Sequence, residues 1–261
     1  MAVVGERFPL DRTSFDAVSL DVGGVLVLPD HGMLGHALAA AGVRHDRARF
    51  GDGHYVAMAE VDRSRSRPEE FTDYTHAFLR AVGVAADQIE AGAAALAAVL
   101  VLPVWHQPVP GARAAAARLA AAGLRLGVTS NADGTVAEML ARHELLQIGD
   151  GPGLAVEHIS DSGVIGVHKP DAAMFVATAE GLGLPLERIC HIGDAGGYDA
   201  DGAADAGMVA VHVDPLALCP ADHIHVASLA DFADRLLGRA GGTGTGRPDR
   251  ARASADPAAP G

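Results

Sequence analysis

The sequence contains few cysteines and few aromatic residues, and each shortage narrows what the protein can be. Only two of its 261 residues are cysteines, Cys190 in an apolar run and Cys219 beside Pro220. Neither context resembles a CxxC metal motif or a disulfide framework, so a reduced cytoplasmic setting is predicted. Aromatic residues make up only 4% of the chain, whereas hydrophobic residues make up 49%. Ala, Val and Leu must therefore fill the core, which suits helices packed on a parallel sheet.

Positive charge and long apolar runs are scarce as well. The formal net charge of -13 would repel phosphate backbones and anionic lipid surfaces, so neither nucleic acid nor a membrane is an expected partner. No segment reaches the roughly 18 uninterrupted apolar residues of a membrane span, and residues 1–15 lack the apolar stretch of a signal peptide. We therefore predict a soluble, cytoplasmic monomer or homodimer.

Short apolar runs alternate with helical segments along most of the chain. The predicted strands cover residues 17–28, 124–129, 155–159, 188–192 and 208–213. Helical patterns cover residues 111–122, 171–181 and 199–206 between them. This alternation predicts an α/β fold built on a Rossmann-like, doubly wound parallel sheet.

The first two predicted strands are separated by about eighty residues, far more than one crossover helix requires. The composition of this stretch is helical and shows no strand-like alternation. We therefore predict a helical cap at 31–107, inserted into a discontinuous core formed by 1–30 and 108–238. Residues 239–261 hold too few large apolar side chains to offset their ordering entropy, which predicts a disordered tail.

Polar residues stand where the predicted strands end, and ligands of open α/β sheets bind beyond such ends. A carboxylate such as Asp21 within an apolar strand is costly unless a cation or hydrogen-bond donors compensate it. Lys169 opens a helix, where the helix dipole opposes a cation, so an anionic partner is expected. Ser130 and Asn131 follow a strand and could bind an anion or simply cap the next helix.

Two further carboxylates, Asp194 and Asp199, lie five residues apart across a glycine-rich loop. Mg²⁺ prefers oxygen ligands and takes a few carboxylates together with waters and substrate phosphate. The loop 193–199 therefore predicts a magnesium site, against the alternative of solvated turn acids.

The order and spacing of these groups resemble the four motifs of the haloacid dehalogenase superfamily over residues 17–213. The stretch 169–175, KPDAAMF, and the loop around Asp194 match well. The resemblance is to the phosphatase-like subgroup with a helical C1 cap. It implies that Asp21 attacks phosphorus and forms an aspartyl-phosphate, with Ser130 and Lys169 as further catalytic residues.

The same resemblance implies a Mg²⁺ cofactor and a small phosphorylated metabolite as substrate. Its implied ligands are Asp21, the backbone carbonyl of Gly23, Asp194 and Asp199. Gly23, Gly24 and Asn131 are the implied substrate contacts.

The sequence departs from the family at Gly23, where phosphatases usually carry the aspartate that protonates the leaving oxygen. General acid–base catalysis contributes typically about 10²–10⁴-fold, so substrates with good leaving groups, such as acyl phosphates or sugar 1-phosphates, become the favoured ones. Asp30, His31 or another cap histidine is a possible substitute. The cap histidines form no HExxH-like pair, so a second metal is not expected.

Two alternatives to a phosphatase follow from the missing aspartate. Carbon–halogen hydrolysis needs no proton for its leaving halide, but the family's dehalogenases need no magnesium and usually carry an aromatic residue at the position of Gly23. The other alternative is a binding or regulatory protein that kept the fold and lost turnover.

Overall fold

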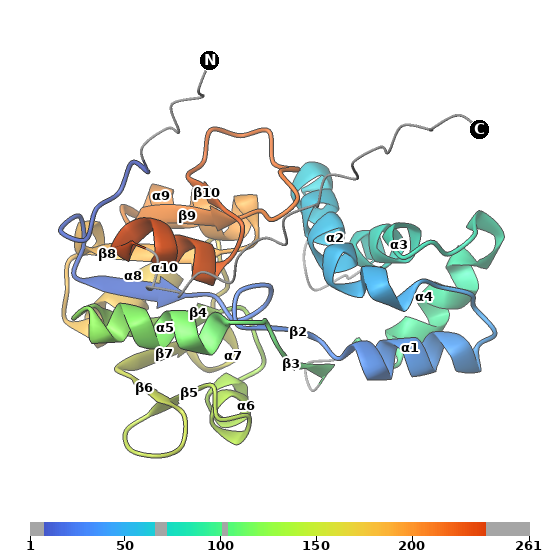
Figure 1. Ribbon diagram of the computed structural model, residues 1–261, viewed down its shortest axis with the longest axis horizontal. Coiled ribbons are helices and arrows are strands. Elements are labelled where there is room, and N and C mark those ends of the chain that lie inside the picture. Colours follow the sequence, from blue (N-terminus) through green and yellow to red (C-terminus); the bar gives the residue numbers. More distant parts are fainter. Residues whose placement is uncertain (1–7, 66–71, 101–103, 239–261) are drawn as a thin grey trace, which may run out of the picture.

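The structure is a computed structural model that describes residues 8–65, 72–100 and 104–238 (Figure 1). The predicted disordered tail, 239–261, lies outside these residues. Within the described ranges, no helix combines the length and apolarity needed to cross a membrane.

The larger part of the molecule is built on a six-stranded sheet in the order β10-β9-β8-β1-β4-β7. Every neighbouring pair of its strands is parallel. From β1 in the middle, the chain first builds one side of the sheet and then the other, which confirms the predicted doubly wound α/β fold. The strands are β1 (Ala17–Leu20), β4 (Arg125–Ser130), β7 (His158–Asp161), β8 (Ile189–Gly193), β9 (Val209–Val213) and β10 (His225–Val226).

The first strand is shorter than the sequence predicts. The run 17–28 predicts a strand that ends in a loop, but β1 already ends at Leu20 and the chain turns through Val22, whose carbonyl accepts hydrogen bonds from the backbone of Leu26 and Val27. Gly24 makes this turn possible because its φ of +63° is one that other residues rarely adopt. Apolarity alone did not reveal the turn, because its residues are buried like those of the strand.

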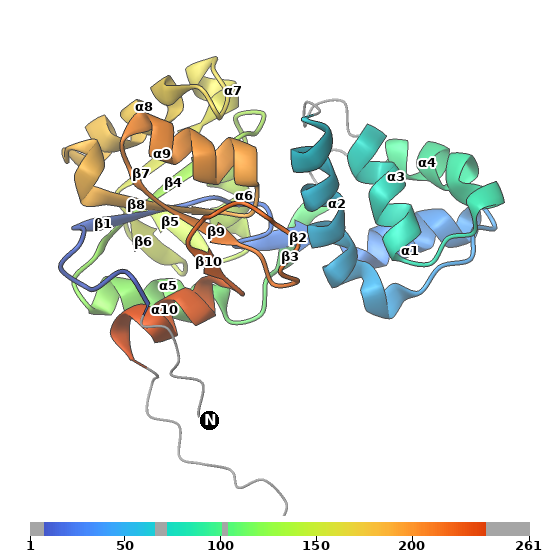
Figure 2. The same ribbon diagram turned by 90° about the horizontal axis from the view of Figure 1, so that it is seen from above.

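Helices cover both faces of the sheet, as Figures 1 and 2 show. Two of them, α5 (Ala112–Ala121) and α10 (Leu229–Leu237), pack together over one face, while α8 (Ala172–Leu182) and α9 (Gly202–Ala206) cover the other. Two apolar clusters hold these layers to the sheet. Shorter helices, α6 (Val136–Arg142) and α7 (Ser162–Ile165), follow β4 and β7.

Two small strand pairs lie outside the main sheet. The first, β2 (Val27–Pro29) with β3 (Trp105–Pro108), is antiparallel and joins the sheet domain to the inserted helices. The second pairs β5 (Leu146–Ile148) with β6 (Leu154–Val156) in parallel. The expected strand at 155–159 is therefore two strands, because the chain passes from the small pair into β7.

The inserted segment between β2 and β3 forms a helical unit with its own apolar core. Phe50 and Phe78 meet edge to face at its centre, with ring centroids 5.3 Å apart. Gly53 lets the second and third helices approach, because a Cβ there would lie 2.9 Å from a Val82 methyl. The helices are α1 (His31–Ala40), α2 (Phe50–Ser64), α3 (Thr72–Ala81) and α4 (Ile89–Ala97).

Candidate active site

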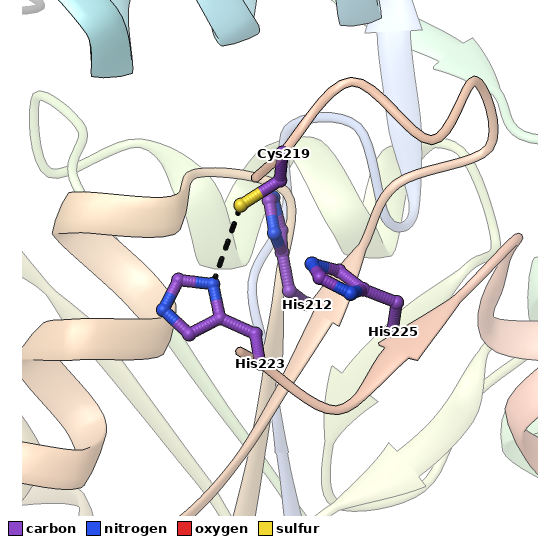
Figure 3. Close-up of side chains that lie close together, drawn as sticks. All are labelled: His212, Cys219, His223 and His225. Atoms are coloured by element: carbon purple, nitrogen blue, oxygen red, sulfur yellow. Dashed lines mark hydrogen bonds between the residues drawn. The ribbon is translucent and has the colours of Figure 1, made fainter. Parts of the chain in front are cut away.

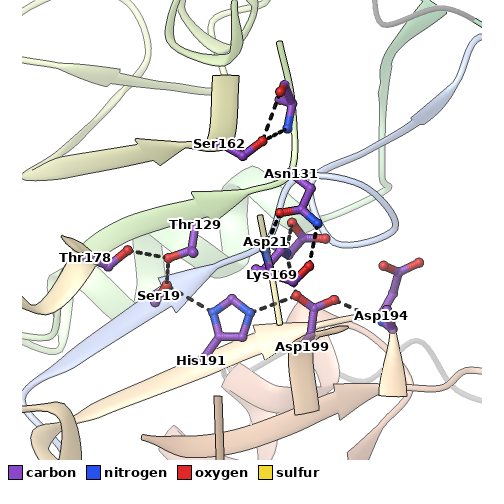
Figure 4. Close-up of polar contacts among 12 residues, drawn as sticks. Ser19, Asp21, Thr129, Asn131, Ser162, Lys169, Thr178, His191, Asp194 and Asp199 are labelled. Atoms are coloured by element: carbon purple, nitrogen blue, oxygen red, sulfur yellow. Dashed lines mark hydrogen bonds and ion pairs between the residues drawn. The ribbon is translucent and has the colours of Figure 1, made fainter. Parts of the chain in front are cut away.

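The carboxyl ends of three neighbouring strands bring the predicted site residues to one edge of the sheet (Figure 4). Asp21 directly follows β1, and its N–H continues the strand pairing by donating to the Ile192 carbonyl at 2.8 Å. Ser130 is the last residue of β4, and Asp194 directly follows β8. Because all these strands are parallel, residues far apart in sequence meet where ligands bind in such sheets.

Lys169 places one positive charge between two carboxylates. Its side chain is almost fully buried, and Nζ donates to Asp21 Oδ1 at 2.7 Å and also to Asp199 Oδ1. Asn131 fixes the lysine backbone, because its Oδ1 accepts from Lys169 N at 2.7 Å and its Nδ2 donates to Lys169 O at 3.1 Å. Asn131 thus holds the loop that carries the lysine, and it also lines the cavity where a substrate contact was predicted for it.

Asp199 is held by several donors besides the lysine. Its Oδ1 also accepts from His191 Nε2 at 3.0 Å, and its Oδ2 accepts from Ala195 N at 3.1 Å. Because a carboxylate can only accept here, His191 donates through Nε2 and its Nδ1 accepts from Ser19 Oγ at 3.1 Å. With both its oxygens engaged, Asp199 is better placed to meet a metal through water than directly.

Burial and the charges of neighbouring side chains set the protonation states of Asp21, Asp199 and Lys169. Burial, with repulsion from Asp199 and Asp194, raises the pKa of Asp21 to about 7, although Lys169 acts in the opposite direction. Burial also acts to raise the pKa of Asp199, but Lys169 and the His191 hydrogen bond outweigh it and hold that pKa below its usual range. The two carboxylates raise the pKa of Lys169 against the effect of its burial, so the lysine stays charged.

Asp194 completes a group of three buried carboxylates, since one oxygen each of Asp21, Asp194 and Asp199 lies within 4.8 Å of the others. Gly24 allows this approach, because a Cβ there would lie 2.1 Å from Asp194 Oδ2. The carbonyl of Gly23 belongs to the turn that follows β1, and it accepts a hydrogen bond from Val25 N at 2.7 Å.

The cap helix α2 contacts both loops of this site. His54, only 2% exposed, places Nε2 2.8 Å from Asp194 Oδ2 and Nδ1 3.0 Å from the Tyr74 hydroxyl. The next residue, Tyr55, donates its hydroxyl to the Gly24 carbonyl at 2.7 Å. About two turns further on, Asp62 accepts from the backbone N–H groups of Gly196 and Gly197 in the loop after Asp194. The cap is therefore tied to the sheet domain on both sides of Asp21.

A cavity of about 160 Å³ lies between the sheet edge and the cap. Asp21, Ser130 and Lys169 line its floor, and Met58 and Trp105 belong to its apolar wall. The space beside Gly23 opens toward the indole, because a Cβ added there would meet Trp105 at 3.7 Å, an ordinary contact distance.

Asp30 and His31, two of the suggested substitutes for the missing aspartate, are not among the residues that line this cavity. Asp30 caps α1 by accepting from Met33 N at 2.6 Å, and the His31 ring contacts the Gln107 amide. His54 is the cap histidine that lines the cavity. The sequence suggested a cap histidine without singling out His54, because the place of this residue beside Asp194 depends on how α2 docks. His191 carried a weak signal, as a polar residue inside an apolar strand.

Comparison with known proteins places the chain in a family. The family model described as haloacid dehalogenase-like hydrolase matches residues 15–207. The chain therefore belongs to the haloacid dehalogenase-like hydrolases. No curated protein sequence matches it.

Solved structures with the same fold include both dehalogenases and phosphatases. A dehalogenase with an intermediate complex superposes with a TM-score of 0.55 at 17% identity, covering 87% of this chain and 98% of that one. A HAD phosphatase from Thermococcus onnurineus gives 0.51 at 15% identity, with 85% and 98% covered. A magnesium-bound protein from Bacillus subtilis, described as a HAD-hydrolase, gives 0.53 at 18% identity, with 85% and 99% covered.

Proposed function

We propose that this hydrolase is a magnesium-dependent phosphohydrolase that acts on a small phosphorylated metabolite through Asp21. The observation that carries the proposal is the charge of the site. Three buried carboxylates, Asp21, Asp194 and Asp199, converge around a single buried lysine. Buried charges need a partner of opposite sign, so the excess negative charge favours a divalent cation.

The donor set fits Mg²⁺ rather than a softer metal. It consists of carboxylate oxygens, and Gly23, whose carbonyl is a further oxygen donor, lines the same cavity; Mg²⁺ prefers such hard oxygen ligands. We propose that Asp21, Asp194 and the Gly23 carbonyl hold the ion, with Asp199 reached through water. When bound, Mg²⁺ would neutralise charge on the phosphoryl oxygens and on the carboxylates.

The chain's own residues account for the covalent step. Lys169 holds Oδ1 of Asp21, so Oδ2 is the oxygen that attacks phosphorus. A bond forms between Oδ2 and phosphorus while the bond from phosphorus to the leaving oxygen breaks. Lys169 and the Ser130 hydroxyl stabilise the negative charge of the transferring group. Water then attacks the phosphorus of the aspartyl-phosphate, which releases phosphate and regenerates the Asp21 carboxylate.

His54 is our candidate for the general acid that replaces the aspartate absent at position 23, where Gly23 has no side chain to donate a proton. It lines the cavity beside Asp194, and both its ring nitrogens contact partners that can exchange protons, a carboxylate and a phenol. A histidine in this position can protonate the leaving oxygen and later accept a proton from water. The cavity is small, which favours compact substrates.

A screen of phosphorylated metabolites with and without Mg²⁺, read as released phosphate, tests the proposal. We expect phosphate release that requires Mg²⁺ in the wild type and is lost in Asp21→Asn. Glu138→Gln is the matched control, because it also removes one negative charge, but from the exposed surface of α6 and away from the cavity. This exchange should leave phosphate release unchanged. Phosphate release that persists in Asp21→Asn would refute the role of Asp21.

Dehalogenation is the second candidate because of Gly23 and the apolar cavity wall. Halide leaves without a proton, so a site without the usual aspartate suits it, and one of the structures with this fold is a dehalogenase. The same variants tested with 2-haloacids and a halide assay separate the two activities. Halide release without Mg²⁺, and no phosphate release from any ester, would replace the phosphatase proposal. Inertness in both assays would favour a binding protein.

A further inference from the structure

A second group of potential metal ligands lies outside the candidate active site, at the end of the sheet formed by β9 and β10. His212, Cys219, His223 and His225 each offer one ligand atom, and these atoms lie within 4.8 Å of one another (Figure 3). The sequence around Cys219 does not resemble a CxxC metal motif, so the sequence alone predicts no metal site here. From the geometry of the second group, we propose that it binds one zinc ion.

Strand pairing brings the three imidazoles together. His212 of β9 is the register partner of His225 in β10, so the two side chains stand next to each other across parallel strands. His223 lies two residues before His225, just ahead of β10, and its ring also lies beside that of His212. The ring centroids are 5.2 Å apart for His212 and His225 and 5.5 Å apart for His212 and His223.

Cys219 reaches the histidines from the loop between the two strands. The carboxylate of Asp214 accepts from Cys219 N at 2.8 Å and from Leu218 N at 3.0 Å, which fixes the turn. This turn directs the thiol at the rings, and Sγ lies 3.5 Å from His223 Nδ1. The sequence did not reveal this arrangement, because a two-residue strand and the eleven-residue loop before it carry no periodicity.

Hydrogen bonds on the outer side of the cluster leave inward-facing nitrogens available. His212 Nε2 donates to the Asp194 carbonyl at 3.1 Å, and His223 Nε2 donates to Asp201 Oδ1 at 2.9 Å. Such partners fix the tautomer of metal-binding histidines and leave the Nδ1 lone pair for the metal.

Two ring nitrogens of the cluster provide an independent indication of a ligand. His212 Nδ1 and His225 Nε2 are buried and have no hydrogen-bond partner in the described part of the chain. His212 is only 4% exposed, and a buried nitrogen without a partner costs free energy. A metal ion would satisfy both nitrogens.

The donor set fits zinc. Three imidazole nitrogens and one thiolate are nitrogen and sulfur donors of the kind that four-coordinate zinc takes, unlike the all-oxygen group at Asp21. Ligands at zinc bond lengths of 2.0–2.3 Å lie about 3.3–3.7 Å apart in a tetrahedron, which the Sγ to Nδ1 separation already matches. Because all four ligand atoms lie within 4.8 Å of one another, no pair would have to close by more than about 1.5 Å to reach this geometry. Binding displaces the Cys219 thiol proton to solvent.

Cobalt titration of the chelator-stripped full chain tests the proposal. Tetrahedral Co²⁺ bound to a thiolate gives intense visible bands and a near-ultraviolet thiolate-to-cobalt band, whereas the oxygen site at Asp21 gives neither. We expect both signals in the wild type, bleached by one equivalent of Zn²⁺, and no thiolate band in Cys219→Ser. Zinc should also raise the melting temperature of the wild type but not of Cys219→Ser.

Matched variants separate the cluster from the rest of the chain. Cys190→Ala removes the other cysteine and His36→Ala an exposed histidine, and both should keep the cobalt signals. Asp201→Ala removes the partner of His223 and should weaken zinc binding by about 10–100-fold. A wild type without the thiolate-to-cobalt band overturns the proposal, whether or not the variants fold. An unchanged band in Cys219→Ser also overturns it.

Discussion

Replacing Lys169 by methionine tests the charge balance on which the candidate site depends. Methionine keeps much of the volume of the lysine and removes its charge. In the wild type, the lysine meets both Asp21 and Asp199 with a side chain that is only 3% exposed. Lys169→Met therefore leaves two neighbouring buried carboxylates without their shared counter-ion.

The expected loss of stability follows from this burial. Removing one partner of a buried ion pair costs about 3–5 kcal/mol, because the remaining charge stays desolvated. For a protein of this size, about 2–4 °C of melting temperature corresponds to each kcal/mol, so the metal-free variant should melt roughly 6–20 °C lower. The loss should be smaller at pH 5 than at pH 8, because protonation of Asp21 removes part of the uncompensated charge.

Urea and thermal denaturation of the metal-free proteins measure this difference. Arg142→Met is a matched control, because it also removes one positive charge from an ion pair, but the pair with Glu138 is exposed on α6. Such an exposed helix pair contributes only about 0.3–0.5 kcal/mol. Mg²⁺ should recover part of the stability lost in Lys169→Met and none of that lost in the control.

Three results would contradict the reasoning. A loss below about 1 kcal/mol in Lys169→Met would mean that the carboxylates are solvated or already neutral. A loss that grows as the pH falls would have the wrong sign for uncompensated carboxylates. Recovery with Mg²⁺ in the control alone would place the ion away from Lys169.

Three further predictions concern Gly23, His54 and Asp21. Gly23→Asp should raise kcat/KM for alkyl phosphates more than for activated aryl phosphates, and an equal gain in a leaving-group series would contradict it. His54→Gln should slow the hydrolysis of substrates with poor leaving groups by about 10²–10⁴-fold and leave that of substrates with good leaving groups unchanged. An equal loss of rate across the series would indicate a structural role for His54. Because the pKa of Asp21 is raised to about 7, its contribution to the stability of the metal-free protein is complete near pH 4 and is lost as the pH rises through 7. Mg²⁺ added below pH 7 should release a proton in a weakly buffered titration, and Asp21→Asn should release none.

The residues at the strand ends could be predicted because the pattern that places them is local. A parallel strand buried on both faces is a continuous apolar run, so the first polar residue after it marks the carboxyl end. Asp21, Asp194 and Ser130 stand out in this way. Parallel strands then bring such ends to one edge of the sheet, whatever the loops between them contain.

Other parts of the site depend on contacts that no local pattern records. His54 reaches Asp194 only through the docking of α2. Trp105 borders the cavity because β2 and β3 pair, and β3 was not among the strands predicted from the sequence. The pairing of His212 with His225 requires the register of a strand that is only two residues long.

The contacts of α2 show how the position of the cap is coupled to the candidate active site. His54, Tyr55 and Asp62 lie on this one helix and reach Asp194, Gly24 and the backbone N–H groups after Asp194. Any movement of the cap away from the sheet domain would break these hydrogen bonds together. It would also withdraw His54, the proposed proton donor, while leaving Asp21 and Lys169 in place.

The nucleophile and the proposed proton donor thus belong to different parts of the molecule. With the cap in the position described, water is restricted to a small cavity and the histidine lies beside the carboxylates, so proton transfer to a leaving oxygen is possible. With the cap withdrawn, the aspartyl-phosphate could form only from substrates whose leaving groups need no proton. A Tyr55→Phe exchange removes the hydrogen bond to Gly24 and so weakens the attachment of the cap to the sheet domain. The dependence of kcat/KM on leaving-group pKa should therefore be steeper in Tyr55→Phe than in the wild type.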